Sequence, residues 1–378
     1  MRKIYLFTFM MLLLVHLKGQ AQQITLHVER AGTLHGMINA SRLPYITDLK
    51  LTGELNGTDI SFIRTLVKKN LRFLDLSEAR IVEGGAIYYS NYHTSNDIIG
   101  SYMFYNPDYS PISPCAISKI NLPNSVTGIE EGAFKSCTRL TDINIPNSVT
   151  SIEWATFYSC TSLTDINIPD AVKSIEPETF SGCTRLTDIN IPNSVTSIGY
   201  EAFYNCTRLT DINIPNSVTS IERSTFYSCT GLTSINIPGS VTTIGSNAFY
   251  DCTSLTDINI PNSVTSIGEQ AFYNCDNLKS VYMNASTPPF IGSQAFHNIS
   301  KDLTIYIPRG SYTAYWLSYW GNYNLVEYDP TDIQGVTTSA HNGVEKYFSI
   351  DGRPLPGPCK GVNIIQDTDG KTRKAWIP

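Results

Sequence analysis

Apolar residues recur at fixed places along the middle of the chain, and each place returns after 23 residues. One unit runs (Ile/Leu)-Pro-x-(Ser/Ala)-Val-x-x-Ile, continues to a Phe, and closes with Cys-x-x-Leu-x-x-(Ile/Val) before the next Pro. In the unit from Leu140 to Pro146 the alternation of Ile143 and Ile145 predicts a strand with one buried face. The register holds in the prolines (123, 146, 169, 192, 215, 238, 261), the phenylalanines (134, 157, 180, 203, 226, 249, 272) and the cysteines (137, 160, 183, 206, 229, 252, 275).

A unit of this length is one supersecondary element that cannot bury its apolar side alone. A period of about 20 to 29 residues is that of leucine-rich repeats, which stack into a solenoid. We therefore predict a leucine-rich repeat solenoid, mainly β, with 23-residue repeats, short irregular or 3-10 return legs and an amino-terminal cap. The return leg, Val149 to Ile152 followed by Phe157, is expected to close the second apolar edge of the interior.

The repeat resembles that of a known family. The segment from Ala202 to Pro215, Ala-Phe-Tyr-Asn-Cys-Thr-Arg-Leu-Thr-Asp-Ile-Asn-Ile-Pro, is similar to the leucine-rich repeat of BspA-like bacterial surface proteins. The resemblance covers residues 115 to 327, and its end, Ile307 to Tyr315, resembles the closing turn of that family. Because those proteins are adhesion-related antigens of anaerobic Bacteroidetes, the resemblance implies adhesion or interaction, although a fold alone does not fix a function.

The segments outside the repeats have different roles. The chain begins with a basic start, an apolar run and a small-residue end, the three regions of a secretory signal peptide. Leu49–Gly53 and Leu71–Ser77 each predict a strand. Ala31 to Leu34 followed by Leu55 to Ile60 is similar to the cap of BspA-like proteins, and Ile60 to Lys69 predicts a helix. The expected domains are a signal peptide (1–21), an amino-terminal cap region (22–110), the solenoid (111–327), and a linker with a small carboxy-terminal β tail (328–378).

The tail has its own resemblance. Tyr347 to Leu355 and Lys360 to Ile365 are similar to the final strands of the sorting domains found in type IX secretion substrates. The tail is shorter than those domains, and it ends in Ala-Trp-Ile-Pro rather than in basic residues. Its alternative is a small terminal β module of another role.

Composition bears on which partners the protein can bind and where it is located. The chain has 27 Lys and Arg against 33 Asp and Glu, a net charge of −6, so it lacks the basic surface that binding to nucleic acid requires. The apolar run near the start is too short for a comfortable membrane span of about 20 residues, and we expect no integral membrane segment after signal removal. We expect an exported protein, extracellular or on the outer cell surface.

Nine cysteines in an exported chain suggest disulfides, but their geometry argues against them. Seven of them form one column of the repeat, where stacked neighbours lie about 4.8 Å apart with parallel side chains. A disulfide needs Cβ atoms that converge to about 3.8 Å. We predict buried, unreactive thiols, whereas Cys115 and Cys359 lie outside the column and have no interpretable spacing.

Two outward columns are candidate binding surfaces. Acids stacked one strand apart repel by roughly 3 kcal/mol at an effective dielectric of 20, so the acidic column must be solvated on an open face. Two interpretations remain: simple solvation of that face, or a polar sheet that binds a protein, a glycan or a cation. The column consists of Asp142, Asp165, Asp188, Asp211 and Asp257, interrupted by Ser234 and Ser280, and is followed two residues on by Asn144, Asn167, Asn190, Asn213 and Asn259.

A second column places an aromatic ring after the core Phe. Rows of tyrosine are common at contact surfaces, because a large flat ring gives contact area at low entropy cost. Packing between turns explains such a row equally well. The candidate residues are Tyr158, Tyr204, Tyr227, Tyr250 and Tyr273.

Sequence motifs of catalysis are absent. The six histidines share no metal-ligand spacing, and the chain has neither a Gly-x-Ser-x-Gly elbow nor a phosphate-binding glycine loop, so we assign no catalytic, cofactor or metal residues. We predict a non-enzymatic secreted or cell-surface protein that binds a host or bacterial surface protein or glycan through its repeat face. The alternatives are a structural surface spacer and a carbohydrate-binding module of a glycan-utilisation system.

Overall fold

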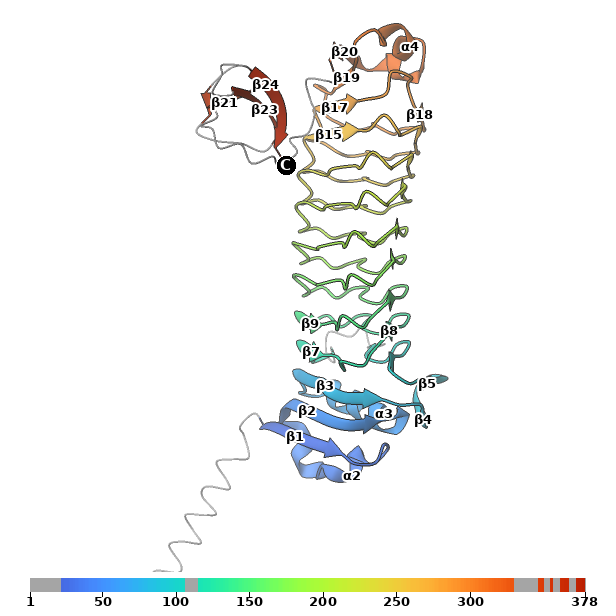
Figure 1. Cartoon of the computed structure of the whole chain (residues 1–378), viewed down its shortest axis with the longest axis vertical. Coiled ribbons are helices and arrows are strands. Elements are labelled where there is room, and N and C mark those ends of the chain that lie inside the picture. The colour runs from blue at the N-terminus through green and yellow to red at the C-terminus, as the bar shows by residue number, and fades with distance from the viewer. Residues whose placement is uncertain are drawn as a thin grey trace, which may run out of the picture.

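The protein is a long rod of stacked coils (Figure 1). The computed structural model describes residues 22–105, 115–329, 346–349, 354–355, 361–366 and 372–377. The predicted signal peptide lies outside the described residues. The leucine-rich repeat solenoid predicted from the 23-residue period is confirmed, since residues 23 apart pair with one another from coil to coil.

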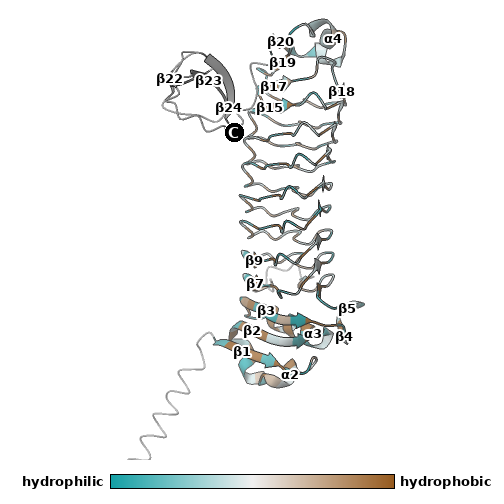
Figure 2. Cartoon of the chain, viewed as in Figure 1, coloured by the Kyte–Doolittle hydropathy of each residue, from teal (hydrophilic) through white to brown (hydrophobic). Residues whose placement is uncertain are grey.

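The amino-terminal end is a parallel sheet with a helix packed on it. The sheet has the strand order β1-β2-β3-β7-β9, so it continues from the cap into the repeats. Hydrophobic and hydrophilic residues alternate along its first strands (Figure 2). The elements of this end are β1 (Gln22–Val28), α2 (Leu34–Met37), η2 (Ala40–Tyr45), β2 (Ile46–Leu55), α3 (Gly57–Val67), β3 (Phe73–Ile81), β4 (Gly84–Tyr89) and β5 (Tyr92–Thr94).

Helix α3 is fixed at its start by a capping box. The Asn56 side chain accepts from the backbone N–H of Thr58, and Asp59, which is fully buried, accepts from the backbone N–H of Asn56. Asp59 also accepts from the Leu34 N–H at 2.9 Å, so one carboxylate joins two segments of the cap. The two strands and the helix predicted for this region all form, within a few residues of the expected bounds.

The first ladder of strands follows one side of the solenoid, as a sheet at each end and isolated bridges between them. Its pairs are in register by one repeat, as in Asp257 opposite Ser280, and isolated bridges such as Asn167 to Asn190 continue it through the middle coils. It confirms the strand predicted from the alternation of apolar residues. Its strands in the repeats are β7 (Lys119–Asn121), β9 (Asp142–Asn144), β15 (Asp257–Ile260), β17 (Ser280–Met283), β19 (Thr304–Pro308) and β20 (Asn324–Tyr328).

The return legs form a second parallel ladder. Each contributes only two residues, typically Ser-Ile, and the Ile is buried. In the described repeats the legs are these strands and hydrogen-bonded turns, whereas the assigned 3-10 segments, η2 and η3, lie at the two ends. The strands are β6 (Ile98–Ile99), β8 (Gly128–Ile129), β10 (Ser151–Ile152), β11 (Ser174–Ile175), β12 (Ser197–Ile198), β13 (Ser220–Ile221), β14 (Thr243–Ile244), β16 (Ser266–Ile267) and β18 (Phe290–Ile291).

The core is a set of columns in which each side chain packs on its own copy. The Phe rings stack from Phe104 to Phe296 with centroids 4.9–5.6 Å apart. This column begins at Phe104, before the expected start of the solenoid at residue 111, because β6 already pairs with β8. The division of the chain into domains otherwise stays a prediction.

The carboxy-terminal end of the solenoid is closed by aromatic residues. The segment after β19 forms α4 (Tyr312–Trp316) and η3 (Tyr319–Asn322). Tyr315 and Trp320 are fully buried; the Tyr315 hydroxyl donates to the Ala285 carbonyl at 2.8 Å, and the Trp320 Nε1–H donates to the Pro289 carbonyl at 2.9 Å. These two bonds attach the closing segment to the last coil.

The tail contains a small antiparallel sheet with the strand order β22-β21-β23-β24. Its strands are β21 (Lys346–Ser349), β22 (Pro354–Leu355), β23 (Gly361–Gln366) and β24 (Thr372–Ile377). Among the described residues, no helix has the length and apolar character needed to cross a bilayer.

The third side of each coil is a chain of turns that uses two left-handed residues. In the second full repeat these are Ala155 and Ser159, with φ of 52° and 56°, and the pattern returns in each following coil. A residue with a Cβ atom pays roughly 1–2 kcal/mol for this conformation. In the next coil the position of Ser159 is held by Gly182, which adopts φ of 75°.

We expect Ser159→Gly to raise the free energy of unfolding by about 0.5–1 kcal/mol. Glycine removes the cost of the left-handed conformation in the folded state, and this gain exceeds the stability lost because glycine raises the entropy of the unfolded chain. Ser197→Gly is the control, since Ser197 lies in the extended strand β12, where glycine costs about 0.5–1 kcal/mol. Urea unfolding of both variants measures the difference. Equal destabilisation by the two substitutions would contradict the claim that the left-handed backbone at Ser159 is strained.

Candidate functional site

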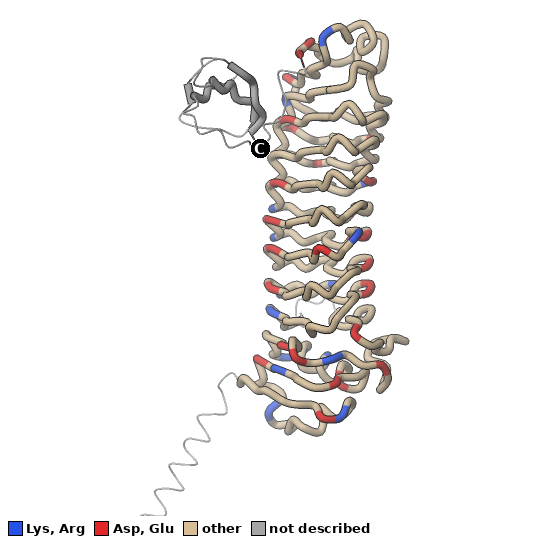
Figure 3. Tube along the Cα trace, viewed as in Figure 1, with Lys and Arg blue, Asp and Glu red and all other residues tan. Residues whose placement is uncertain are grey.

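The first ladder presents an acidic and amide surface, which we call the Asp/Asn face. Ile143 and Ile145 are buried, while Asp142 and Asn144 on either side of Ile143 are exposed. Figure 3 shows Asp and Glu along the edges of the rod. The outward orientation predicted from the alternation is therefore present in four consecutive coils, at Asp142, Asn144, Asp165, Asn167, Asp188, Asn190, Asp211 and Asn213.

Hydrogen bonds and one ion pair order parts of this face. Asp142 accepts from the Lys119 ammonium at 2.7 Å, so the first acid of the column is neutralised. Asp165 accepts from the Thr164 hydroxyl at 3.0 Å, and Asp257 accepts from the Thr256 hydroxyl at 2.8 Å. These are exposed contacts, and we expect each to add little to stability.

The carboxy-terminal end of the column departs from the prediction. Asp257 and Asn259 are half-buried rather than exposed, and burial raises the pKa of Asp257. The Oδ1 atoms of both residues are buried and have no hydrogen-bond partner among the described residues. The next coil places Tyr282 opposite Asn259, where earlier coils have Asn, and Tyr282 stacks on Tyr306 at 4.7 Å. The Asp/Asn face thus changes to an aromatic surface at this end.

The candidate tyrosines are brought together in part. Tyr204, Tyr227, Tyr250 and Tyr273 stack in sequence with ring centroids 4.5–4.9 Å apart, and His297 continues the stack at 5.4 Å. We call these five rings the Tyr column. They are half-buried, except for His297, which is exposed, so the stack leaves ring edges accessible on the side formed by the turns. The column both packs between coils and forms a surface.

Tyr158 lies apart from the Tyr column. The intervening coil has Ser181 at the equivalent position, and this small residue interrupts the stack. The Lys135 ammonium lies over the Tyr158 ring at 4.5 Å and over the Trp154 ring at 5.6 Å. Tyr158 therefore belongs to a separate cation–π cluster.

A third surface was missed from the sequence. Glu130, Glu153 and Glu176 follow the return-leg Ile in three consecutive coils, so a second acidic column runs along the second ladder. Burial, with the charges of Glu176 and Glu130, raises the pKa of Glu153. The signal was the dipeptide Ile-Glu at a fixed place in the repeat, which glycine replaces in later coils such as at Gly199 and Gly245.

The cysteine column is part of the core, as predicted. Each Sγ from Cys137 to Cys275 donates to the carbonyl of a Phe in a neighbouring coil at 3.1–3.3 Å, and all the described cysteines are free and buried. Burial raises the pKa of Cys183, Cys229 and Cys275 to about 12. Cys115, whose spacing was not interpretable, lies in hydrogen-bond contact with Cys137. Cys359 lies outside the described residues.

The arrangement of these columns suits reversible binding. The described residues contain no group of three His, Cys, Asp or Glu side chains that could share a metal ion. Each column offers the same group at regular heights, whereas catalysis needs one asymmetric set of groups. A flat periodic surface instead offers many equivalent weak contacts to an extended partner.

The stability of the fold is expected to fall as pH rises from about 9 to 12. The thiol of Cys183 keeps its proton to about 12 when folded but releases it near its ordinary value of 9.0 when unfolded. Its stabilising effect is therefore complete below pH 9 and is lost above it. Between pH 9 and 11 the unfolding free energy of the wild type should fall by about 2 kcal/mol more than that of Cys183→Ala. Parallel pH profiles from denaturant unfolding would contradict this.

Comparison with known proteins identifies the repeat. The profile of the BspA type leucine rich repeat region matches residues 97–233 and 219–327, which together make up more than half of the chain. A search of the curated proteins gave no match.

Several solved structures are similar to parts of the chain. A leucine-rich repeat protein of T. pallidum is 30% identical over 42% of this chain and 71% of its own, with a TM-score of 0.38. One from Bacteroides ovatus is 20% identical over 68% of this chain and 92% of its own, with a TM-score of 0.29. A leucine-rich cell surface protein of Faecalibacterium prausnitzii is 23% identical over 61% of this chain and 88% of its own, with a TM-score of 0.28.

Proposed function

This chain belongs to the family of BspA-type leucine-rich repeat proteins, and from that premise we propose that it is an exported or cell-surface protein that binds a protein or glycan through its repeat face. It acts as an adhesion or interaction protein and not as an enzyme. The observation that carries the proposal is the Tyr column, in which four tyrosines and one histidine stack at 4.5–5.4 Å with accessible edges. Aromatic rings held in this way contact a partner with little further loss of entropy.

The Asp/Asn face supports the same proposal from another side of the coil. Four coils carry exposed Asp and Asn at matching heights, so a partner with regularly spaced hydroxyl or amide groups meets equivalent acceptors in each coil. Contacts that are individually weak add up along such a surface. A ligand that spans several coils is therefore favoured over a small compact one.

Binding of the mature chain to arrays of extracellular proteins and of glycans tests the proposal. In one variant Tyr204, Tyr227 and Tyr250 are changed together to Ser, the residue that the chain already has at position 181. In the other, Asp165, Asp188 and Asp211 are changed together to Asn. We expect at least one variant to lose tenfold or more in affinity for the partner that the wild type selects, while the thermal unfolding of the Asp variant stays nearly unchanged.

The outcomes separate the proposal from its alternatives. A wild type that binds nothing on either array favours the structural spacer. Binding that neither triple variant weakens removes both the Tyr column and the Asp/Asn face as the binding surface. Selection of glycans alone supports the carbohydrate-binding module.

We further propose that residues 1–21 direct export and that the tail serves in sorting to the cell surface. The support is the signal-like start of the sequence and the antiparallel sheet β22-β21-β23-β24 at the other end. Deletion of residues 330–378, which keeps strand β20 intact, should move the protein from the cell surface to the medium or the periplasm, as measured by antibody labelling of whole cells. Unchanged surface labelling would reject a sorting role for the tail.

A further inference from the structure

Exposed large apolar side chains gather at the carboxy-terminal end of the solenoid. Phe290 on β18 is 65% exposed, Leu317 at the end of α4 is 80% exposed, and Tyr319, the first residue of η3, is 75% exposed. Trp316 on the neighbouring helix α4 is 57% exposed. Contiguous exposed apolar side chains of this size usually mark a binding surface.

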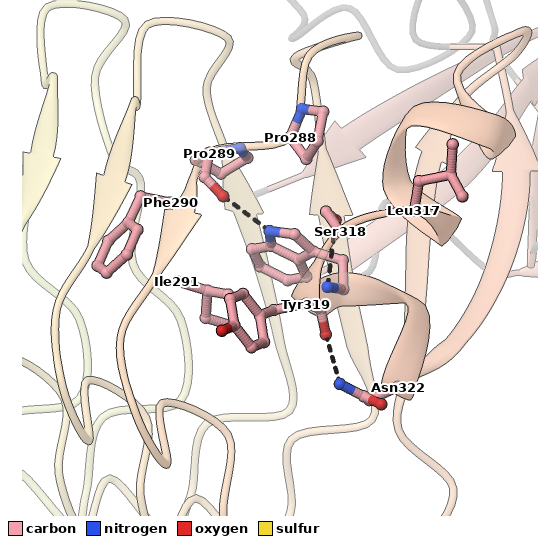
Figure 4. Close-up of a pocket in the computed structure, with 9 residues that line it drawn as sticks. Pro288, Pro289, Phe290, Ile291, Leu317, Ser318, Tyr319 and Asn322 are labelled. Atoms are coloured by element: carbon pink, nitrogen blue, oxygen red, sulfur yellow. Dashed lines mark hydrogen bonds between the residues drawn. The ribbon is translucent and has the colours of Figure 1, made fainter.

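Phe290, Leu317 and Tyr319 border a groove. An open cleft of about 450 Å³ lies between β18 and η3, with Phe290, Ile291, Leu317 and Tyr319 among its walls (Figure 4). A second cleft of about 400 Å³ shares Phe290 and Tyr319 with it and extends the groove toward Gln294.

A third cleft extends the groove in the other direction. It has a volume of about 480 Å³, shares Pro288 and Pro289 with the first, and is lined by Asn262, Asn284 and Thr287. The three clefts form one groove around the last coils.

The groove carries no formal charge. None of the residues that line the three clefts is Asp, Glu, Lys, Arg or His. Recognition of a phosphate, a carboxylate or a charged peptide requires an opposite charge or an array of backbone N–H groups. A neutral ligand is therefore the better match.

Polar groups on the rim are held in fixed orientations. The Asn322 Nδ2 donates to the Tyr319 carbonyl at 3.0 Å, which leaves its Oδ1 as an acceptor. The Gln294 Oε1 accepts from Gln270 at 2.9 Å, and the Asn284 Oδ1 accepts from the Tyr328 hydroxyl at 2.6 Å, which leave their NH₂ groups as donors. The rim thus offers both donors and acceptors in preset positions, and binding them costs little ordering entropy.

An extended peptide is the less suitable occupant. β18 is the last strand of the second ladder, where a peptide could in principle add as a further strand. The indole N–H of Trp320, however, donates to the Pro289 carbonyl directly before β18. Main-chain pairing, which gives such peptides most of their affinity, is blocked at this carbonyl.

We propose that the groove is a binding site for a neutral oligosaccharide. The C–H faces of pyranose rings pack on the exposed rings of Phe290 and Tyr319, while sugar hydroxyls, which both donate and accept, pair with Asn322, Gln294 and Asn284. The site is separate from the Asp/Asn face and the Tyr column, so it stands or falls independently of the repeat-face proposal.

Isothermal titration calorimetry of residues 22–378 tests the site. The probes are cellohexaose, xylohexaose, mannohexaose and maltohexaose, with hexagalacturonate as the anionic comparison. At least one neutral hexasaccharide should bind, and 0.5 M NaCl should not weaken it. Phe290→Ala and Tyr319→Ala should each reduce its affinity tenfold or more, whereas Tyr200→Ala, which removes a 40% exposed ring of the repeats, should leave it unchanged.

Circular dichroism first establishes that the variants fold, and Tyr319→Phe supplies a second check, because it keeps the ring and should retain the affinity. Binding of none of the neutral hexasaccharides would overturn the proposal. So would binding that both alanine variants preserve, or equal binding of hexagalacturonate. The triple variants of the repeat face should bind the hexasaccharide as the wild type does, which distinguishes this site from the repeat face.

Discussion

The structure depends on one constraint: each inward side chain must pack against its own copy in the next coil. The Phe column shows it most directly, with parallel rings at 4.9–5.6 Å from Phe104 to Phe296. Parallel pairing of residues 23 apart sets the height of every side chain at once, so no column can change its spacing alone. For the same reason the outward side chains form columns too. The periodic surface is a consequence of the periodic core.

This constraint separates structural columns from those that are free to serve another purpose. Ser148 and Ser194 donate to the carbonyls of Val126 and Val172 in the preceding coil, and Thr150 donates to Thr127 in the same way. These hydroxyls satisfy backbone acceptors at the corners of the coil, which explains their recurrence without any ligand. On the Asp/Asn face, Asp142, Asp165 and Asp257 pair instead with side chains, those of Lys119, Thr164 and Thr256.

The sequence predicted the parts of the fold that repeat. Alternation around Ile143 was sufficient for the first ladder and for the exposure of Asp142, because one face of a strand must be buried. The second ladder was harder to predict, since two-residue strands such as β10 are too short to show a period of two. The break of the Tyr column at Ser181 could be predicted from the alignment of the repeats alone. The burial of Asp257 could not be predicted in this way. It depends on the next coil, where Tyr282 lies opposite Asn259 and replaces the Asn of the earlier coils.

The groove at the carboxy-terminal end could not be predicted from the repeat pattern. Phe290 stands where the earlier return legs have Ser or Thr, and Tyr319 lies in the closing segment outside the repeats. The two residues line one cleft because Trp320 and Tyr315 attach the closing segment to the last coil. A solenoid can vary its ends without disturbing its interior, since each coil contacts only its neighbours. An aperiodic end is therefore where a repeat protein can build a single asymmetric site, and its periodic flank is where many weak contacts add up. The periodic flank requires the same residue in every coil, whereas the end requires a set of different residues in one place, and this chain has both kinds of surface.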